Sequence, residues 1–223
     1  MKLVVSAQRS GLNWVRYCIE RFTGCRTPGK QLLLKQGNPC FVRSHDPLGA
    51  RGKSGGAWLR VDPSATEGQT VVLLLRNHRE SFFRMAEGKW RPYVTFLTNI
   101  KFFVASASVN KRVFYYEDFV AKPEAMDEVI RFLEASSPAY SLEEMSSGWE
   151  QAAEESRAAY SVNQAGAGGA MTRSNPFDFN FHTRSKPPTR LQEIDDFTRA
   201  ILSKEELALL QRYTLNASAS ERS

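Results

Sequence analysis

The sequence predicts a single-domain α/β fold, in which a central, mainly parallel β-sheet is flanked by helices. Short apolar segments alternate with longer segments of helical periodicity, an order typical of strands joined by crossover helices. The segment 70–76, TVVLLLR, is apolar without alternation, as in a parallel strand buried on both faces. The chain has 223 residues, 42% hydrophobic and 24% charged, which is sufficient to bury a core.

Four segments carry strand patterns and are bounded by turn residues. The strands are expected at 2–6, 41–44, 69–76 and 112–117. The first predicted helix covers 14–22, where apolar residues recur at helical spacing, and Gly24 closes it. The first strand is thus expected to lead through a short turn into a helix.

Three further helices are expected later in the chain. Residues 126–133 show helical periodicity behind Pro123, which suits the first turn of a helix. The aromatic-rich segment 90–107 is expected to form a long helix, whose aromatic residues either line a cavity or, as is more common at helical spacing, pack in the core. The sequence SKEE at 203–206 has the pattern of a capping box and begins the last helix.

The domain is expected to span residues 1–215, with two mobile parts. The segment 163–175 begins with a run rich in Gly and Ala and is expected to be a mobile loop, and 216–223 a disordered tail. The polar, basic and proline-containing stretch 171–190 has the length of a lid. No internal repeat occurs in the sequence.

The net charge of +6 favours an anionic partner. The basic residues are neither clustered in one run nor interleaved with aromatic residues, so no nucleic-acid partner is expected. No apolar run approaches a membrane span, and the start of the chain lacks the apolar core of a signal peptide. Cys18, Cys25 and Cys40 lack metal-ligand spacing, so we expect free thiols, no metal and a cytoplasmic location.

The stretch SAQRSGLNW, residues 6–14, lies between the first strand and the first helix. A basic turn at this place directs backbone N–H groups and an Arg toward one point, as in phosphate sites. The stretch GARGKSGG at 49–56 resembles a Walker A loop, but Pro47 stands where that motif needs its first Gly. A nucleotide kinase or ATPase is therefore disfavoured.

Three more stretches place polar residues where predicted strands end. FVRSH ends on His45, LLLRNHRESFFR places Arg76 after the buried strand, and VFYYEDF places Tyr116 after the last one. In an open α/β sheet, ligands bind outside the carboxyl ends of the strands. These three residues and the first turn are expected to meet at one edge of the sheet.

These stretches together resemble the PAPS-dependent sulfotransferases, whose fold is of the P-loop nucleotide-binding type. The family's P-[KR]-S-G-x-T-W motif is matched by AQRSGLNW, its K-[ST]-H motif by RSH at 43–45, and its R-N-P-R-D-x-x-x-S motif by RNHRESFFR at 76–84. Its YED stretch, the helix after it and the FL pair are matched at 116–133. The resemblance covers residues 3–133 and is weak beyond them.

The resemblance implies a sulfotransferase that moves a sulfuryl group from 3′-phosphoadenosine 5′-phosphosulfate (PAPS) to a hydroxyl or amine and releases PAP. His45 is the implied general base, and Arg9 stabilises charge on the 5′-phosphate. The implied nucleotide-binding residues are Arg9, Ser10, Gly11, Leu12, Asn13, Trp14, Arg76, Arg84, Tyr116, Arg184 and Lys186. Backbone N–H groups of 10–13 hold the 5′-phosphate, Trp14 and Tyr116 contact adenine, and Arg76 binds the 3′-phosphate.

The sequence departs from the family at several of these positions. Leu12 and Asn13 replace residues of the first motif, and Arg84 replaces the Ser expected at the 3′-phosphate. The family's C-terminal basic loop is absent, and FHTRSKPP, with Arg184 and Lys186, is its expected substitute. These changes leave open a non-catalytic relative that binds a nucleotide or an anionic glycan. The acceptor is expected to be a small molecule or a glycan.

Overall fold

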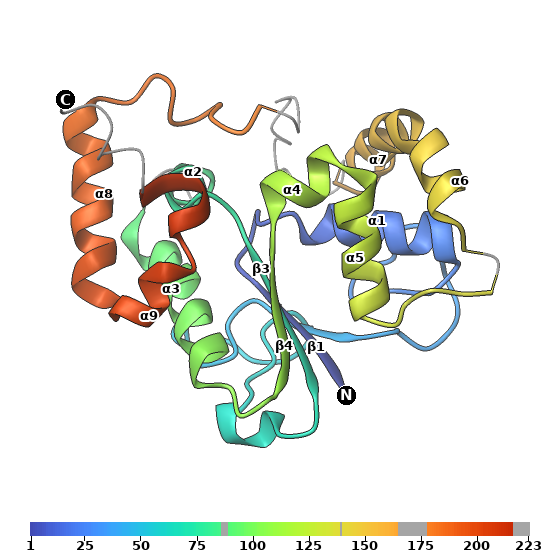
Figure 1. Cartoon of the computed structure of the whole chain (residues 1–223), viewed down its shortest axis with the longest axis horizontal. Helices are drawn as coiled ribbons and strands as arrows, with labels where there is room; N and C mark the ends of the chain where they lie inside the picture. Colours follow the sequence, from blue (N-terminus) through green and yellow to red (C-terminus); the bar gives the residue numbers. More distant parts are fainter. Residues whose placement is uncertain (86–88, 139, 165–177, 216–223) are drawn as a thin grey trace.

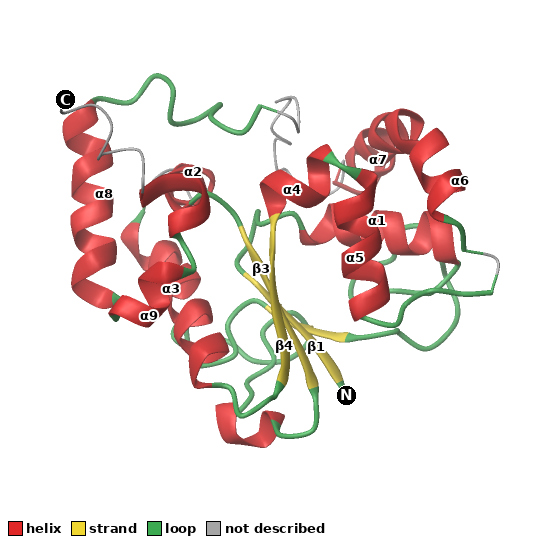
Figure 2. Ribbon diagram, viewed as in Figure 1, coloured by secondary structure: helices red, strands yellow, loops and turns green. Residues whose placement is uncertain are grey.

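The computed structural model describes residues 1–85, 89–138, 140–164 and 178–215. Its four strands form one parallel sheet in the order β2-β1-β3-β4 (Figures 1 and 2). The strands are β1 (Lys2–Ser6), β2 (Val42–Ser44), β3 (Thr70–Leu75) and β4 (Asn110–Tyr115). The α/β class and the parallel sheet are confirmed.

Helices cover both faces of this sheet (Figures 1 and 2). One face carries α1 (Leu12–Thr23), α4 (Tyr116–Ala121), α5 (Pro123–Phe132), α6 (Leu142–Ser147) and α7 (Trp149–Gln164). The other carries α2 (His78–Arg84), α3 (Trp90–Ala105), α8 (Pro188–Ile201) and α9 (Lys204–Ala208). Two short helices, η1 (Pro63–Thr66) and η2 (Gln211–Leu215), complete the described chain.

Alternate residues of the central strands enter two hydrophobic cores. Val4 and Val72 lie in the core under α1 and α5, whereas Val5 and Leu73 lie in the core under α3. All four side chains are fully buried, because β1 and β3 are covered on both faces. The apolar run without alternation that predicted a buried parallel strand is explained by this double burial.

Several local predictions are confirmed by the structure. α1 ends at Gly24, whose φ of 69° is the left-handed conformation favoured by glycine. α5 begins with Pro123 in its first turn, and α9 carries the predicted capping box between Ser203 and Glu206. The three cysteines are free.

Other predicted boundaries were wrong. β4 ends at Tyr115, and Tyr116 begins α4 instead of ending the strand, because the acids at 117 and 118 suit the first turn of a helix. Residues 163–164 of the expected mobile loop belong to α7, and 188–190 of the expected lid belong to α8. The rest of that mobile loop, the first part of the lid and the tail lie outside the described residues.

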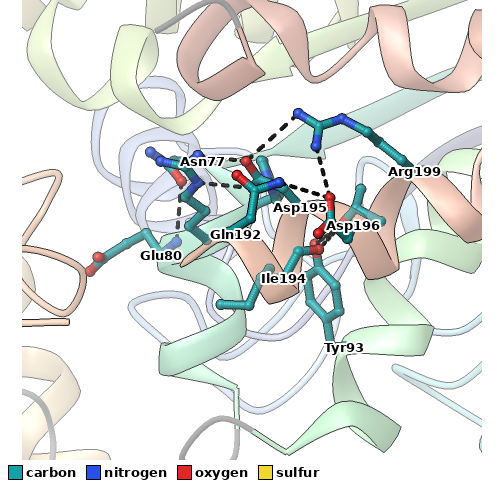
Figure 3. A network of polar contacts seen from close by, with 11 residues as sticks. Asn77, Glu80, Tyr93, Gln192, Ile194, Asp195, Asp196 and Arg199 are labelled. Atoms are coloured by element: carbon teal, nitrogen blue, oxygen red, sulfur yellow. Dashed lines mark hydrogen bonds and ion pairs between the residues drawn. The ribbon is translucent and has the colours of Figure 1, made fainter. Parts of the chain in front are cut away.

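A buried ionic network joins α2 to α8 (Figure 3). Asp195 is 2% exposed and accepts a hydrogen bond from His78 Nε2 at 2.8 Å. Arg79 donates two more to the same carboxylate, at 2.9 and 2.5 Å. Burial alone would raise the pKa of Asp195, but the hydrogen bonds from Arg79 and His78 outweigh it and hold that pKa well below its usual range. The network fixes the C-terminal helices to the element that follows β3.

We expect His78 to make the fold sensitive to mild acid. Burial lowers the pKa of His78, and the charges of Arg79 and Arg199 lower it further. The hydrogen bond that His78 donates to Asp195 raises this pKa, but the net shift is downward. Below about pH 6.5 the unfolded chain therefore binds a proton that the folded chain excludes, so the free energy of unfolding falls as the pH falls. Urea unfolding between pH 7 and 5 should show a shallower pH slope for His78→Gln, which keeps a donor for Asp195. Identical slopes in both proteins would contradict this assignment.

Candidate functional site

The candidate site lies at the carboxyl ends of the parallel strands. The turn after β1, His45 after β2, Arg76 after β3 and Tyr116 after β4 all follow strand ends at this edge. The stretch 178–187 crosses the same edge between α4 and α8 (Figure 1). The predicted convergence of strand-end residues at one edge of the sheet is thus observed.

At one position in the turn after β1, the backbone adopts a conformation that only glycine fits. Gly11 caps α1 with a φ of 88°, and a Cβ built on it would lie 2.5 Å from the ring of Tyr116. Arg9 also has a positive φ, of 72°. No side chain caps the first turn of α1 and no acid lies in it, so this helix end is suited to an anion. Ser10 is fully buried, and its Oγ has no hydrogen-bond partner among the described residues.

Arg76 is a buried cation with unused donors. It is 2% exposed, and its guanidinium lies 3.9 Å from the centre of the Tyr116 ring. Its Nη1 donates to the Arg9 carbonyl at 3.4 Å, but within the described ranges Nε and Nη2 have no partner. Burial lowers the pKa of Arg76, which reflects the cost of a charge removed from water. An anion beside Arg76 would satisfy these donors.

Glu117 and Asp118 contact other protein groups. Glu117 accepts a hydrogen bond from the backbone N–H of Asn77 at 2.9 Å, and burial raises its pKa. Asp118 pairs with Arg212 at 3.0 Å and accepts a hydrogen bond from Tyr213. Glu117 thereby fixes the chain between Arg76 and α2.

Glu80 attaches the stretch 178–187 to α2. This fully buried carboxylate accepts hydrogen bonds from Arg84 Nε at 2.9 Å and from the backbone N–H groups of His182 and Thr183 at 3.1 to 3.2 Å. Arg84 therefore lies beside the stretch that was predicted to replace the family's basic loop. Glu80, which binds both Arg84 and this stretch, was not identified from the sequence.

His182 lies within a group of cations. Its Nε2 is buried without a partner among the described residues. Burial is the first cause that lowers its pKa, and the charges of Arg84, Arg76 and Lys186 add to it, against Glu80. Arg76, Arg84 and Lys186, three of the residues predicted to bind nucleotide, are thus electrostatically coupled at one place. His182 was not assigned to the site from the sequence.

The remaining predicted nucleotide residues have protein partners. Arg184 is exposed and pairs with Asp178 at 2.8 Å, and the Lys186 ammonium lies 5.0 Å from the Phe83 ring. Trp14 contacts Trp149 edge to face, with ring centres 5.0 Å apart, and its indole N–H donates to the Phe119 carbonyl at 3.2 Å. Trp14 thus joins α1 to α7 and α4, where the sequence predicted an adenine contact.

His45 is held with one ring nitrogen fixed. Its Nδ1 lies 2.7 Å from the carbonyl oxygen of Ser6. Because a carbonyl can only accept, Nδ1 carries the hydrogen and Nε2 carries the lone pair that a general base needs. Burial lowers the pKa of His45, with the charges of Arg43 and Arg16 acting in the same direction, so the neutral ring is the main form at pH 7.

A small cavity opens beside His45. Its lining residues are Ala7, Gln8, His45, Arg51, Trp58, Met85, Pro92 and Thr95. Residues 57–59 run antiparallel to the end of β2, with a bridge between Ser44 and Trp58. This pairing brings Trp58 to His45, with ring centres 5.9 Å apart. Pro92 and Thr95 of α3 line this cavity, whereas the aromatic residues of α3 are buried in the core, including Tyr93, Phe96 and Phe102.

The stretch 49–56 forms turns with no helix after it, unlike a Walker A loop. The described residues include no group of three or more His, Cys, Asp or Glu side chains placed to bind a metal ion. No helix in the described ranges is long and apolar enough to cross a membrane.

Comparison with protein-family models, curated proteins and solved structures gives no match.

Proposed function

We propose that this protein is a sulfotransferase that uses PAPS to sulfate a hydroxyl or amine. The observation that carries the proposal is Arg76, a cation that is 2% exposed and has two buried nitrogens without partners. A buried charge of this kind costs free energy unless a counter-charge satisfies it. A phosphate group is a suitable counter-charge, since it accepts several hydrogen bonds from a guanidinium.

The surrounding residues fit a nucleotide with two separate phosphate groups. The buried Ser10 hydroxyl and the uncapped N-terminus of α1 offer donors to one phosphate. Arg76 offers the donors Nε and Nη2 to a second, and Arg84 and His182 lie close enough for their charges to influence one another. PAPS carries a 5′-phosphosulfate and a 3′-phosphate, and it would supply an activated sulfuryl group.

His45 would remove the acceptor's proton. Its Nε2 takes the proton from the acceptor hydroxyl or amine, which forms the new bond to sulfur as the sulfur–oxygen bond to the 5′-phosphate breaks. Arg9 and the N-terminus of α1 would stabilise the negative charge left on that phosphate. His45 lines one cavity with Ala7 and Gln8 of the turn after β1 and is hydrogen-bonded to Ser6 at the end of β1, which supports this division of roles.

Calorimetric titration with PAP, AMP and ATP tests the nucleotide site. We expect PAP to bind the wild type at micromolar concentration and AMP, which lacks the 3′-phosphate, to bind more weakly. Arg76→Met should weaken PAP binding about 10- to 100-fold, the usual cost of losing hydrogen bonds to a charged group. Arg112→Met is the matched control, because Arg112 is exposed on β4 and pairs with Glu128. Equal affinity for PAP and AMP, or no effect of Arg76→Met, would refute the proposal.

A further inference from the structure

His182 has a fixed backbone and an unused ring nitrogen. The Glu80 carboxylate accepts hydrogen bonds from the backbone N–H groups of His182 and Thr183, at 3.1 to 3.2 Å. Glu80 is fully buried, so this part of the stretch 178–187 is held against α2. The His182 Nε2 atom is buried and has no partner among the described residues. The fold therefore places His182 but makes no use of its Nε2.

Arg84 and His182 are brought together by the same carboxylate. The Oε1 atom of Glu80 accepts a hydrogen bond from Arg84 Nε at 2.9 Å and another from the His182 N–H at 3.2 Å. The Arg84 side chain is only 9% exposed, so water screens its charge poorly. A guanidinium and an imidazole thus lie beside one buried acid.

The charges that act on His182 are mainly positive. Burial lowers its pKa most, the charges of Arg84, Arg76 and Lys186 lower it further, and Glu80 opposes them. Glu80 already pairs with Arg84, and neither Arg76 nor Lys186 forms an ion pair within the described ranges. A water molecule could satisfy single hydrogen bonds here, but only an anion offsets the excess positive charge. The group therefore favours an anion over water.

A proton on His182 would strengthen such an anion site. Protonation makes both ring nitrogens donors, and imidazole has an ordinary pKa of about 6.5. The surrounding cations oppose this proton in the free protein, whereas a bound phosphate, with a charge of roughly −1.5 to −2 near pH 7, favours it. The other charged residues of the stretch, Arg184 and Asp178, pair with each other at 2.8 Å. The protonation of His182 is thus expected to depend on whether an anion is bound.

We propose that His182 is a ligand of the phosphate group that Arg76 binds, and that it takes up a proton from solvent when this group binds. Arg76 supplies Nε and Nη2 to the phosphate oxygens, and His182 Nε2 supplies a third donor. The inference rests on the proposed nucleotide site for the identity of the ligand, but any phosphate-like anion at Arg76 should cause the same proton uptake. The affinity of the site then rises as the pH falls.

The histidine ring signals test the proton uptake directly, because the chain contains three histidines. The Cε1–Hε1 signals of His45, His78 and His182 are followed by NMR between pH 5 and 8, in the full-length protein alone, with PAP and with inorganic pyrophosphate. His182→Gln and His45→Gln assign the signals, since each removes one of them. We expect PAP to move the titration of His182 to higher pH and to leave that of the buried His78 unchanged.

Calorimetric titration measures the consequence for affinity. His182→Gln keeps a donor but cannot take up the proton, so it should bind PAP about as well as the wild type at pH 7.5. At pH 5.5 the wild type should bind PAP about 10-fold more tightly than this variant, the usual size of one charge-assisted hydrogen bond. The comparison cancels the titration of the phosphate itself, because both proteins bind the same ligand. AMP, which lacks the 3′-phosphate, should show a smaller difference.

The outcomes separate this inference from the proposed function. If PAP binds but leaves the His182 titration unchanged, or if the wild type and His182→Gln show the same pH dependence, the inference is overturned and the nucleotide site stands. If PAP does not bind but pyrophosphate moves the His182 titration to higher pH, the sulfotransferase proposal fails and the inference is supported. No response of His182 to either compound overturns the inference.

Discussion

Replacing His45 with alanine is expected to lower the rate of sulfuryl transfer about 10²- to 10⁴-fold, the usual contribution of a general base. Among the described residues that line the cavity, only His45 has a ring nitrogen with a free lone pair, because its Nδ1 hydrogen is donated to the Ser6 carbonyl. PAP affinity should change little, since His45 lies outside the cationic group around Arg76. Single-turnover transfer from labelled PAPS and PAP titration measure the two effects separately.

The pH profile distinguishes a chemical from a structural role of His45. The neutral ring is the active form, and burial places its pKa below the ordinary value of about 6.5. Transfer by the wild type should therefore fall only below that pH, and added imidazole should partly restore the Ala variant. An unchanged rate in His45→Ala would assign proton removal to another group, and PAP binding without transfer to any acceptor would favour a non-catalytic binding protein.

Replacing Asp195 with asparagine is expected to lower the free energy of unfolding by about 3–5 kcal/mol, the range measured when one partner of a buried ion pair is removed. The carboxylate accepts hydrogen bonds from both His78 and Arg79, and it is buried between α2 and α8 (Figure 3). Its loss removes the counter-charge of Arg79, whose side chain is only 22% exposed, and the charged acceptor of the fully buried His78.

The next residue in the sequence supplies the control. Asp196 pairs with Arg199 at 3.2 Å, but its side chain is 63% exposed, and such pairs contribute at most about 1 kcal/mol. Urea unfolding of Asp195→Asn and Asp196→Asn at pH 7 therefore compares the same chemical change in two environments. Equal destabilisation of the two variants would show that burial of the network does not determine its contribution.

The sheet could be predicted because its signals are local. An unbroken apolar run, a glycine after a helix and a proline before one each predict structure from a few neighbouring residues. The end of β4 was predicted at residue 117, two residues too late, because the aromatic residues Tyr115 and Tyr116 both continue a strand pattern, although Tyr116 already belongs to α4. The close approach of Gly11 to the Tyr116 ring joins residues more than a hundred positions apart, so it gave no local signal.

Part of the candidate site could likewise be predicted from the sequence, and part could not. His45, Arg76 and Tyr116 could be predicted at one edge because parallel strands present their carboxyl ends together. The Arg51–Trp58 pair and the contact of Glu80 with the chain at His182 could not, because each depends on how a loop returns to the sheet. Trp14 was predicted to contact adenine. In the structure Trp14 packs against Trp149, and nothing in the sequence indicated this contact.

The hydrogen bonds that Glu80 accepts from His182 and Thr183, 102 and 103 positions later in the chain, have a consequence for the order in which the molecule folds during synthesis. During synthesis the strands and the Arg76 region emerge first, and contacts between distant parts of the chain form late. A nascent chain that ends at α4 already contains Arg76, Ser10 and His45, but it lacks the segment that Glu80 holds. At the proposed nucleotide site, full affinity is therefore expected only after residues 182 and 183 have left the ribosome.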